Sequence, residues 1–293
     1  MRKSMIISLW VSIIVMILTP TFVSASDGTK KLTVVYTNDT LGTLEICKCN
    51  SGGLGGLARR ATVIKKLIAD HPTCMVLESG DLTAISGQLD AAANLRQIAS
   101  VLKSMSYAAV GVGPIDVQLG EAYFTVLRDA GVQVVQVEQS DHVGTVPYLI
   151  KDSGGIRVGI VSFGAVKPEQ RDNFDLLKMR YKTLREVRSK CDVLVLLDQA
   201  GVATEEWLER NAKKLGCPDI VVGGTAWVSL NEPKLVGSTM IVPTSVRGAY
   251  VGQVDIEMHD GKTKMNWSRI PLERSILDDK EVVKILNTAT TER

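Results

Sequence analysis

The sequence predicts an α/β protein with mixed β-sheets flanked by helices, because blocks of strand periodicity alternate with blocks of helical periodicity. Apolar runs such as 31–39 and 73–81 end in polar residues, as strands do where they lead into loops. Later runs, around 233–258 and 263–270, have the pattern of antiparallel strands, which makes the sheets mixed. The chain contains no internal repeat or low-complexity linker, so a single domain is expected over residues 26–293.

The expected elements follow one another in a regular order. Apolar residues at helical spacing predict six helices, over 55–70, 89–105, 121–131, 179–190, 203–215 and 278–290. Compact apolar runs between them predict further strands, over 107–113, 132–138, 191–201 and 218–224. Residues 147–164 predict a hairpin that turns at Ser153-Gly154-Gly155, because a glycine-rich turn between two apolar runs favours one.

The first 25 residues have the pattern of a secretory signal peptide. Arg2 and Lys3 precede an apolar run over residues 5–18, and small residues precede a cut after Ala25. The run is shorter than the ~20 residues that a membrane span needs, and no later run is longer. We therefore expect an exported protein, periplasmic or extracellular, in which disulfides are permissible. An uncleaved N-terminal anchor is the alternative.

Charge argues against several classes of partner. The signal peptide holds two of the 34 basic residues, which leaves 32 basic against 32 acidic residues in the mature chain. A net charge near zero, without a basic stripe, excludes a nucleic-acid or anionic-membrane surface as the expected function.

Five loops follow the expected strands, and their sequences are TNDTLG, SGDLT, GVGPID, LDQAG and VGGTAW. In α/β folds the chemistry gathers in the loops at the carboxyl ends of strands, so all five are expected on one rim.

This succession of loops resembles the N-terminal domain of the metallophosphoesterase superfamily, specifically its secreted 5′-nucleotidase/UDP-sugar hydrolase (UshA-like) branch. In that branch the loops read, in order, Asp-x-His, Gly-Asp, Gly-Asn-His-Glu, a strand ending in His-x-Gly, and Gly-His-x-His. The phrases GGLARRA and PDIVVGG also look like the branch, and the resemblance covers residues 32–272. It implies α/β/β/α layers, and it implies that the branch's C-terminal substrate-specificity domain is absent from this chain.

The resemblance also implies a degenerate metal site. The family's chemistry needs two divalent metals bridged by a carboxylate, with His, Asp and Asn as ligands. Of seven ligand positions only Asp39 and Asp81 are kept, and Asp116 stands where the family has glutamate. The other five ligand positions hold residues that coordinate a cation weakly or not at all, namely Leu41, Pro114, Gln199, Thr225 and Trp227. Ile115 stands where the family has its catalytic histidine.

A pair of transition metals is therefore not expected, and no cofactor is. Asp39 and Asp81 could hold a single Mg²⁺ or Ca²⁺ loosely, or they could serve only as hydrogen-bond acceptors that fix the loops. Trp227, with Leu41 and Ile115, is expected to be largely buried where metals and water lie in active relatives. Stacking of Trp227 on a ligand is the alternative.

Five cysteines are an odd number, so at least one is free or pairs outside the chain. Cys47 and Cys49 flank Lys48 in a glycine-rich loop at the rim, before a helix whose N-terminal end favours a thiolate. The pair has three interpretations: a redox-active dithiol, a soft-metal thiolate site, or a static staple of the loop. Cys74, Cys191 and Cys217 precede strands and are expected as buried apolar residues. A disulfide between Cys191 and Cys217 is an alternative.

The sequence thus favours an exported 5′-nucleotidase-like protein that is inactive as a phosphoesterase and uses its rim for thiol redox chemistry or partner binding. The expected partner is a thiol redox protein or a protein of unknown kind. A residual metal-dependent hydrolase and a plain scaffold module are the alternatives.

Overall fold

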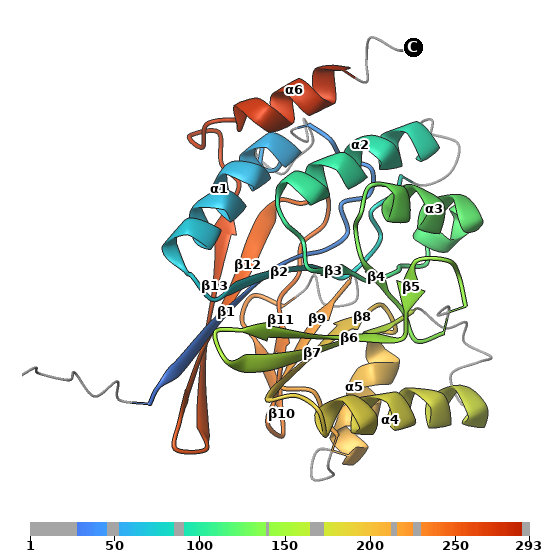
Figure 1. Ribbon diagram of the computed structural model, residues 1–293, viewed down its shortest axis with the longest axis vertical. Helices are drawn as coiled ribbons and strands as arrows, with labels where there is room; N and C mark the ends of the chain where they lie inside the picture. Colours follow the sequence, from blue (N-terminus) through green and yellow to red (C-terminus); the bar gives the residue numbers. More distant parts are fainter. Residues whose placement is uncertain are drawn as a thin grey trace, which may run out of the picture.

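The computed structural model describes residues 28–45, 53–84, 91–138, 141–164, 173–211, 216–224 and 230–288. These residues build two β-sheets with helices on the outer face of each (Figure 1). Across this part of the chain, no helix is both long enough and apolar enough to cross a membrane.

The first sheet has seven strands within the described residues, in the order β13-β12-β1-β2-β3-β4-β5. Its central strand β1 pairs in parallel with β2 and antiparallel with β12, so the sheet is mixed. The strands are β1 (Lys30–Thr37), β2 (Cys74–Glu78), β3 (Ala109–Val110), β4 (Val134–Val135), β5 (Thr145–Val146), β12 (Tyr250–His259) and β13 (Lys262–Pro271).

The second sheet has six strands in the described residues, in the order β10-β11-β9-β8-β7-β6. Strands β7, β8, β9 and β11 run parallel, while β6 and β10 pair antiparallel at the two edges. The expected hairpin is confirmed, since β6 and β7 join through Gly154 and Gly155, both at positive φ. The strands are β6 (Tyr148–Ser153), β7 (Ile156–Phe163), β8 (Val193–Asp198), β9 (Ile220–Gly223), β10 (Lys234–Val236) and β11 (Thr239–Val242).

The helices form the two outer layers. Helices α1, α2, α3 and α6 cover the first sheet, and α4 and α5 cover the second (Figure 1). The helices are α1 (Leu57–Asp70), α2 (Ala91–Ser104), α3 (Glu121–Asp129), α4 (Phe174–Arg188), α5 (Val202–Asn211) and α6 (Lys280–Thr288), with a 3-10 turn η1 (Asp116–Leu119) before α3.

Apolar side chains fill the spaces between the layers. One buried cluster lies between the two sheets and joins Val34 and Leu77 of the first sheet to Ile160 and Val195 of the second. Two others lie between each sheet and its helices. Strands buried on both faces explain why 193–198 is a continuous apolar run ending in a buried Asp198. The expected α/β/β/α layering is confirmed.

The structure differs from the sequence-based expectation in several elements. Helix α4 begins five residues earlier than expected, because Asn173 accepts a hydrogen bond from the Leu176 amide and caps it. Strand β5 was not expected. The expected disulfide alternative is wrong, since Cys191 and Cys217 are free, and both pack in the cluster beneath α4 and α5.

Candidate functional site at the strand ends

The loops that follow β1 and β2 are joined backbone to backbone beyond the end of the sheet. The amide of Asp39 donates to the carbonyl of Gly80 at 3.0 Å, and that of Leu41 donates to Asp81 at 2.9 Å. The amide of Gly42 then donates to Leu82 at 2.8 Å. The two loops therefore continue the pairing of their strands and hold Asp39 and Asp81 at the same level.

Three residues of these loops have left-handed backbone without being glycine. Asp39, Leu41 and Asp81 have φ of 44°, 50° and 54°. A bulky residue in this region stores about 1–2 kcal/mol of strain. Aspartate tolerates the conformation, but leucine gains nothing from it, so the surrounding loop pairing imposes the backbone at Leu41.

Asp39 is completely buried and is contacted by the side chains of its neighbour Asn38 and of Gln199 from the loop after β8. Its Oδ2 accepts from Nδ2 of Asn38 at 2.9 Å, and Nε2 of Gln199 lies 3.5 Å from its Oδ1. The side chain of Asn38 in turn bonds the carbonyl and amide of Ser245. Loops from both sheets thus meet at Asp39, as expected for a common rim.

Asp81 and Asp116 form a second interlocked group. Oδ1 of Asp81 accepts from the Ile115 amide at 2.8 Å. Asp116 accepts four hydrogen bonds: from the amides of Asp81 and Gly113 to its Oδ2, and from the amide and hydroxyl of Thr83 to its Oδ1. Asp116 is fully buried, and its hydrogen bonds connect the loop after β2 to the turn after β3.

Burial shifts the acidity of this group. Burial raises the pKa of Asp81, and the neighbouring carboxylates of Asp116 and Asp39 raise it further. Burial also raises the pKa of Asp116, against the lowering effect of the amides that it accepts. Asp81 and Asp116 are therefore weaker acids here than exposed aspartates are.

The other described positions of the expected site differ in how far their side chains are buried. Leu41 and Ile115 are half-buried, and Pro114 is exposed. Gln199 is half-buried and lies against Gly224, where an added Cβ would come within 2.2 Å of its Oε1. Leu41 and Ile115 are thus partly rather than completely buried, and Trp227, which was expected beside them, lies outside the described residues.

The described donor set does not fit a pair of transition metals. Within the described residues, no group of three or more His, Cys, Asp or Glu side chains is placed to hold a metal ion. The carboxylate oxygens of Asp39 and Asp81 instead accept protein hydrogen bonds. The chemistry of the site, as far as these residues define it, is that of a hydrogen-bonded polar rim.

A buried charged network lies beneath the rim, and the sequence reasoning missed it. Glu78, at the end of β2, is fully buried, and its Oε2 accepts from Oγ1 of Thr37 at 2.6 Å. Nη1 of Arg60 lies 3.7 Å from the same oxygen and donates to Oγ1 of Thr40 at 2.9 Å. Burial raises the pKa of Glu78 to about 7, although Arg60 lowers it. In the sequence, this network is indicated by an acidic residue, Glu78, at the end of the otherwise apolar strand β2.

The described residues on both sides of the segment that carries Cys47 and Cys49 are hydrogen-bonded to the start of α1. The Leu57 amide donates to Leu44 O at 3.0 Å, and Nη1 of Arg59 donates to Gly53 O at 3.0 Å. The two ends of this segment therefore meet at the start of α1. Cys47 and Cys49 themselves lie outside the described residues, as do Thr225 and Trp227.

Sequence comparisons lead to one class of protein. No family model matches the chain. It is 24% identical to the snake venom 5′-nucleotidase of Gloydius brevicauda, over 90% of this chain and 52% of that protein. It is 26% identical to the snake venom 5′-nucleotidase of Naja atra, over 87% of this chain and 56% of that protein. The chain thus spans about half the length of the curated relatives it matches.

Comparison with solved structures supports the same fold. The crystal structure of a 5′-nucleotidase precursor from Thermus thermophilus superposes with a TM-score of 0.73 at 19% identity, covering 90% of this chain and 59% of that one. The calcineurin-like phosphoesterase YfkN from Bacillus subtilis gives 0.68 at 16% identity, covering 90% of this chain and 98% of that one. In sequence the chain is similar to 5′-nucleotidases, and its fold is that of the solved 5′-nucleotidase and calcineurin-like phosphoesterase structures.

Proposed function

We propose that this chain is an exported 5′-nucleotidase-like protein that does not hydrolyse phosphoesters. The observation that carries the proposal is the state of the two retained carboxylates. Asp39 and Asp81 accept hydrogen bonds from Asn38 and Ile115, and the neighbouring positions hold leucine, proline, isoleucine and glutamine. Such a rim lacks the imidazoles that a two-metal phosphoesterase uses to clamp the attacking and leaving oxygens.

The proposal includes export and a role for the rim thiols. The signal-peptide pattern of residues 1–25 supports export, and the names of the sequence relatives place those proteins in venom. We propose that Cys47 and Cys49 exchange with a disulfide of a partner protein. In that exchange the two thiols lose two electrons and two protons, and the partner disulfide gains them and becomes two thiols.

The base of the thiol loop supports this role. The loop ends meet at the N-terminus of α1, where the helix dipole lowers the pKa of a nearby thiol. Gly56 precedes the helix and supplies no side-chain cap, so the first-turn amides are not satisfied by a capping side chain. Arg60 does not add to this effect, because its guanidinium is turned toward Thr40 and Glu78 beneath the rim.

A residual hydrolase is the second candidate. One observation favours it: Asp39 and Asp81 remain close enough for the charge of Asp39 to raise the pKa of Asp81. The carboxylates of Asp39 and Asp81 could together bind a single Mg²⁺ or Ca²⁺ weakly.

Metal content and hydrolysis distinguish the two candidates. The purified chain, incubated with Mn²⁺, Zn²⁺ or Mg²⁺ and then desalted, is analysed for bound metal and assayed on AMP and UDP-glucose. The Thermus thermophilus 5′-nucleotidase serves as positive control, and Asp81→Asn as the matched variant. We expect no stoichiometric metal pair and no turnover above blank. Turnover that Asp81→Asn abolishes would establish the hydrolase instead.

A further inference from the structure

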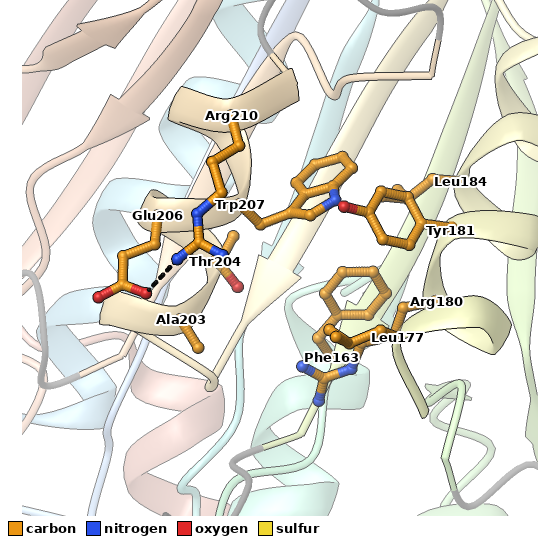
Figure 2. A pocket seen from close by; sticks show the side chains of 10 residues that line it. All are labelled: Phe163, Leu177, Arg180, Tyr181, Leu184, Ala203, Thr204, Glu206, Trp207 and Arg210. Atoms are coloured by element: carbon orange, nitrogen blue, oxygen red, sulfur yellow. Dashed lines mark hydrogen bonds and ion pairs between the residues drawn. The ribbon is translucent and has the colours of Figure 1, made fainter. Parts of the chain in front are cut away.

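A pocket of about 110 Å³ lies between α4 and α5, on the outer side of the second sheet. Phe163, at the end of β7, forms its floor, and side chains of the two helices form its walls (Figure 2). None of the rim residues Asp39, Asp81 and Asp116 lines it. The pocket is therefore separate from the candidate site described above.

Its walls are aromatic and aliphatic. Tyr181 of α4 and Trp207 of α5 meet edge to face with their ring centroids 4.8 Å apart. Phe163 and Leu184 are almost completely buried beneath them. Rigid rings of this kind bind a planar apolar molecule with little loss of side-chain entropy.

The charges at the pocket are already compensated. Arg180 is buried, and its Nε donates to Oε1 of Glu138 at 2.5 Å while its Nη2 donates to Gly164 O at 2.7 Å. Its guanidinium also lies over the ring of Phe163, at 4.7 Å from the centroid. Arg210, at the mouth, is paired with Glu206. Both arginines among the described lining residues are therefore charge-paired, so neither favours an anionic ligand.

Two donors are available at the end of the pocket where Tyr181 meets Trp207. Nε1 of Trp207 is buried, and among the described residues it has no hydrogen-bond acceptor. Figure 2 shows this nitrogen directed at the hydroxyl end of Tyr181. That hydroxyl accepts from Nδ2 of Asn211 at 3.0 Å, so its own proton points elsewhere. A ligand acceptor placed here, with a small rotation of Tyr181, would satisfy both donors.

We propose that the pocket between α4 and α5 binds a small uncharged aromatic molecule with a carbonyl acceptor. The volume limits the ligand to about one ring, since the pocket of about 110 Å³ is smaller than the roughly 150 Å³ apolar cavity that holds one benzene molecule. A nucleotide or another drug-sized ligand needs roughly 300 Å³ or more. The aromatic walls receive the ring, and the donors of Trp207 and Tyr181 receive the carbonyl.

The test follows the indole N–H signals of the protein by ¹⁵N NMR during titration with benzamide, a one-ring aromatic amide. The Trp207 signal is identified by its loss in Trp207→Phe. We expect it to shift and saturate with a dissociation constant on the order of 1 mM. The internal control is Trp267, whose Nε1 donates to the hydroxyl of Tyr36 at 2.8 Å. Its signal should not move.

Variants and a second probe complete the test. Ala203 lines the pocket, so Ala203→Phe should fill it and weaken benzamide binding about tenfold or more. Tyr181→Phe keeps the aromatic wall but removes one hydrogen-bond donor, and it should weaken benzamide binding severalfold. It takes the place of Ala203→Phe if that variant fails to fold. Benzoate should bind less tightly than benzamide. Absence of saturation, equal shifts at Trp267, unchanged affinity in both variants, or tighter binding of benzoate would each overturn the proposal.

Discussion

The backbone amide of Asp81 donates a 2.7 Å hydrogen bond to Oδ2 of Asp116, across 35 residues of sequence. Through it, the loop after β2 is fastened to the turn that follows β3. The same carboxylate holds the amide of Gly113 and, by its other oxygen, Thr83. Asp116 therefore has a structural task, whatever chemistry the rim performs.

Replacing Asp116 by alanine should destabilise the protein by roughly 3 kcal/mol or more, because several buried donors lose their acceptor together. Denaturant unfolding followed by circular dichroism measures the change. Asp129→Ala is the matched control, since Asp129 is exposed and pairs with Arg128 at the surface. Its effect should stay within about 0.5 kcal/mol. Equal effects of the two variants would contradict the assigned role.

Stability should fall as pH rises from about 5 toward 8. Burial raises the pKa of Glu78 from 4.5 to about 7, so between these values the folded state binds more protons at Glu78 than the unfolded state does. The stabilisation is present in full below the unfolded pKa and is lost as pH rises through the folded pKa. Glu78 alone should account for a loss on the order of 2 kcal/mol.

The variant Glu78→Gln isolates this contribution. It should flatten the pH dependence of the free energy of unfolding by that amount, whatever its effect on absolute stability. A variant whose curve runs parallel to that of the wild type between pH 5 and 8 would show that Glu78 stays ionised beside Arg60 throughout.

Leu41 offers a test of backbone strain. At a φ of 50°, Leu41→Gly should be more stable than Leu41→Ala by about 1 kcal/mol, because glycine has no Cβ to clash in the left-handed region. The order should reverse at Lys66, an exposed position of α1, where alanine is the better helix former by about the same amount. If alanine exceeded glycine at both positions, the left-handed conformation at Leu41 would be refuted.

The thiol pair should interconvert between dithiol and disulfide under mild conditions. One intervening residue strains the ring, so the disulfide should be reduced more easily than a structural one. Titration in glutathione buffers, followed by alkylation and mass spectrometry, gives the midpoint. Cys47→Ser and Cys49→Ser are the controls. A midpoint as reducing as that of structural disulfides would leave the static staple as the explanation.

Much of the fold follows from local pattern. Strands 193–198 and 220–223 are buried on both faces, so their composition alone marks them, and the carboxyl ends of such strands bring Asp39, Gln199 and Gly224 to one rim. The start of α4 does not follow from apolar periodicity, because the cap at Asn173 determines where the helix begins.

Other features depend on contacts that one-dimensional pattern does not contain. The Tyr181–Trp207 pair joins residues of two separate helices, α4 and α5, that pack on the same sheet. The side chain of Glu78 in β2 contacts Arg60 of α1 and Thr37 of β1, which lie in other elements of the chain. The left-handed backbone of Leu41 accompanies the pairing of its loop with Asp81, which the hydropathy of the side chain does not indicate.

The amide bonds that join Asp39, Leu41 and Gly42 to the loop after β2 have a consequence for motion. These amides extend a buried parallel ladder, so they exchange with solvent only when the end of that ladder opens. Hydrogen exchange at the three positions should therefore be nearly as slow as in β1 itself. The two loops would then respond to a partner as one rigid edge, and recognition at the rim would rely on a preformed surface rather than on closure of a lid.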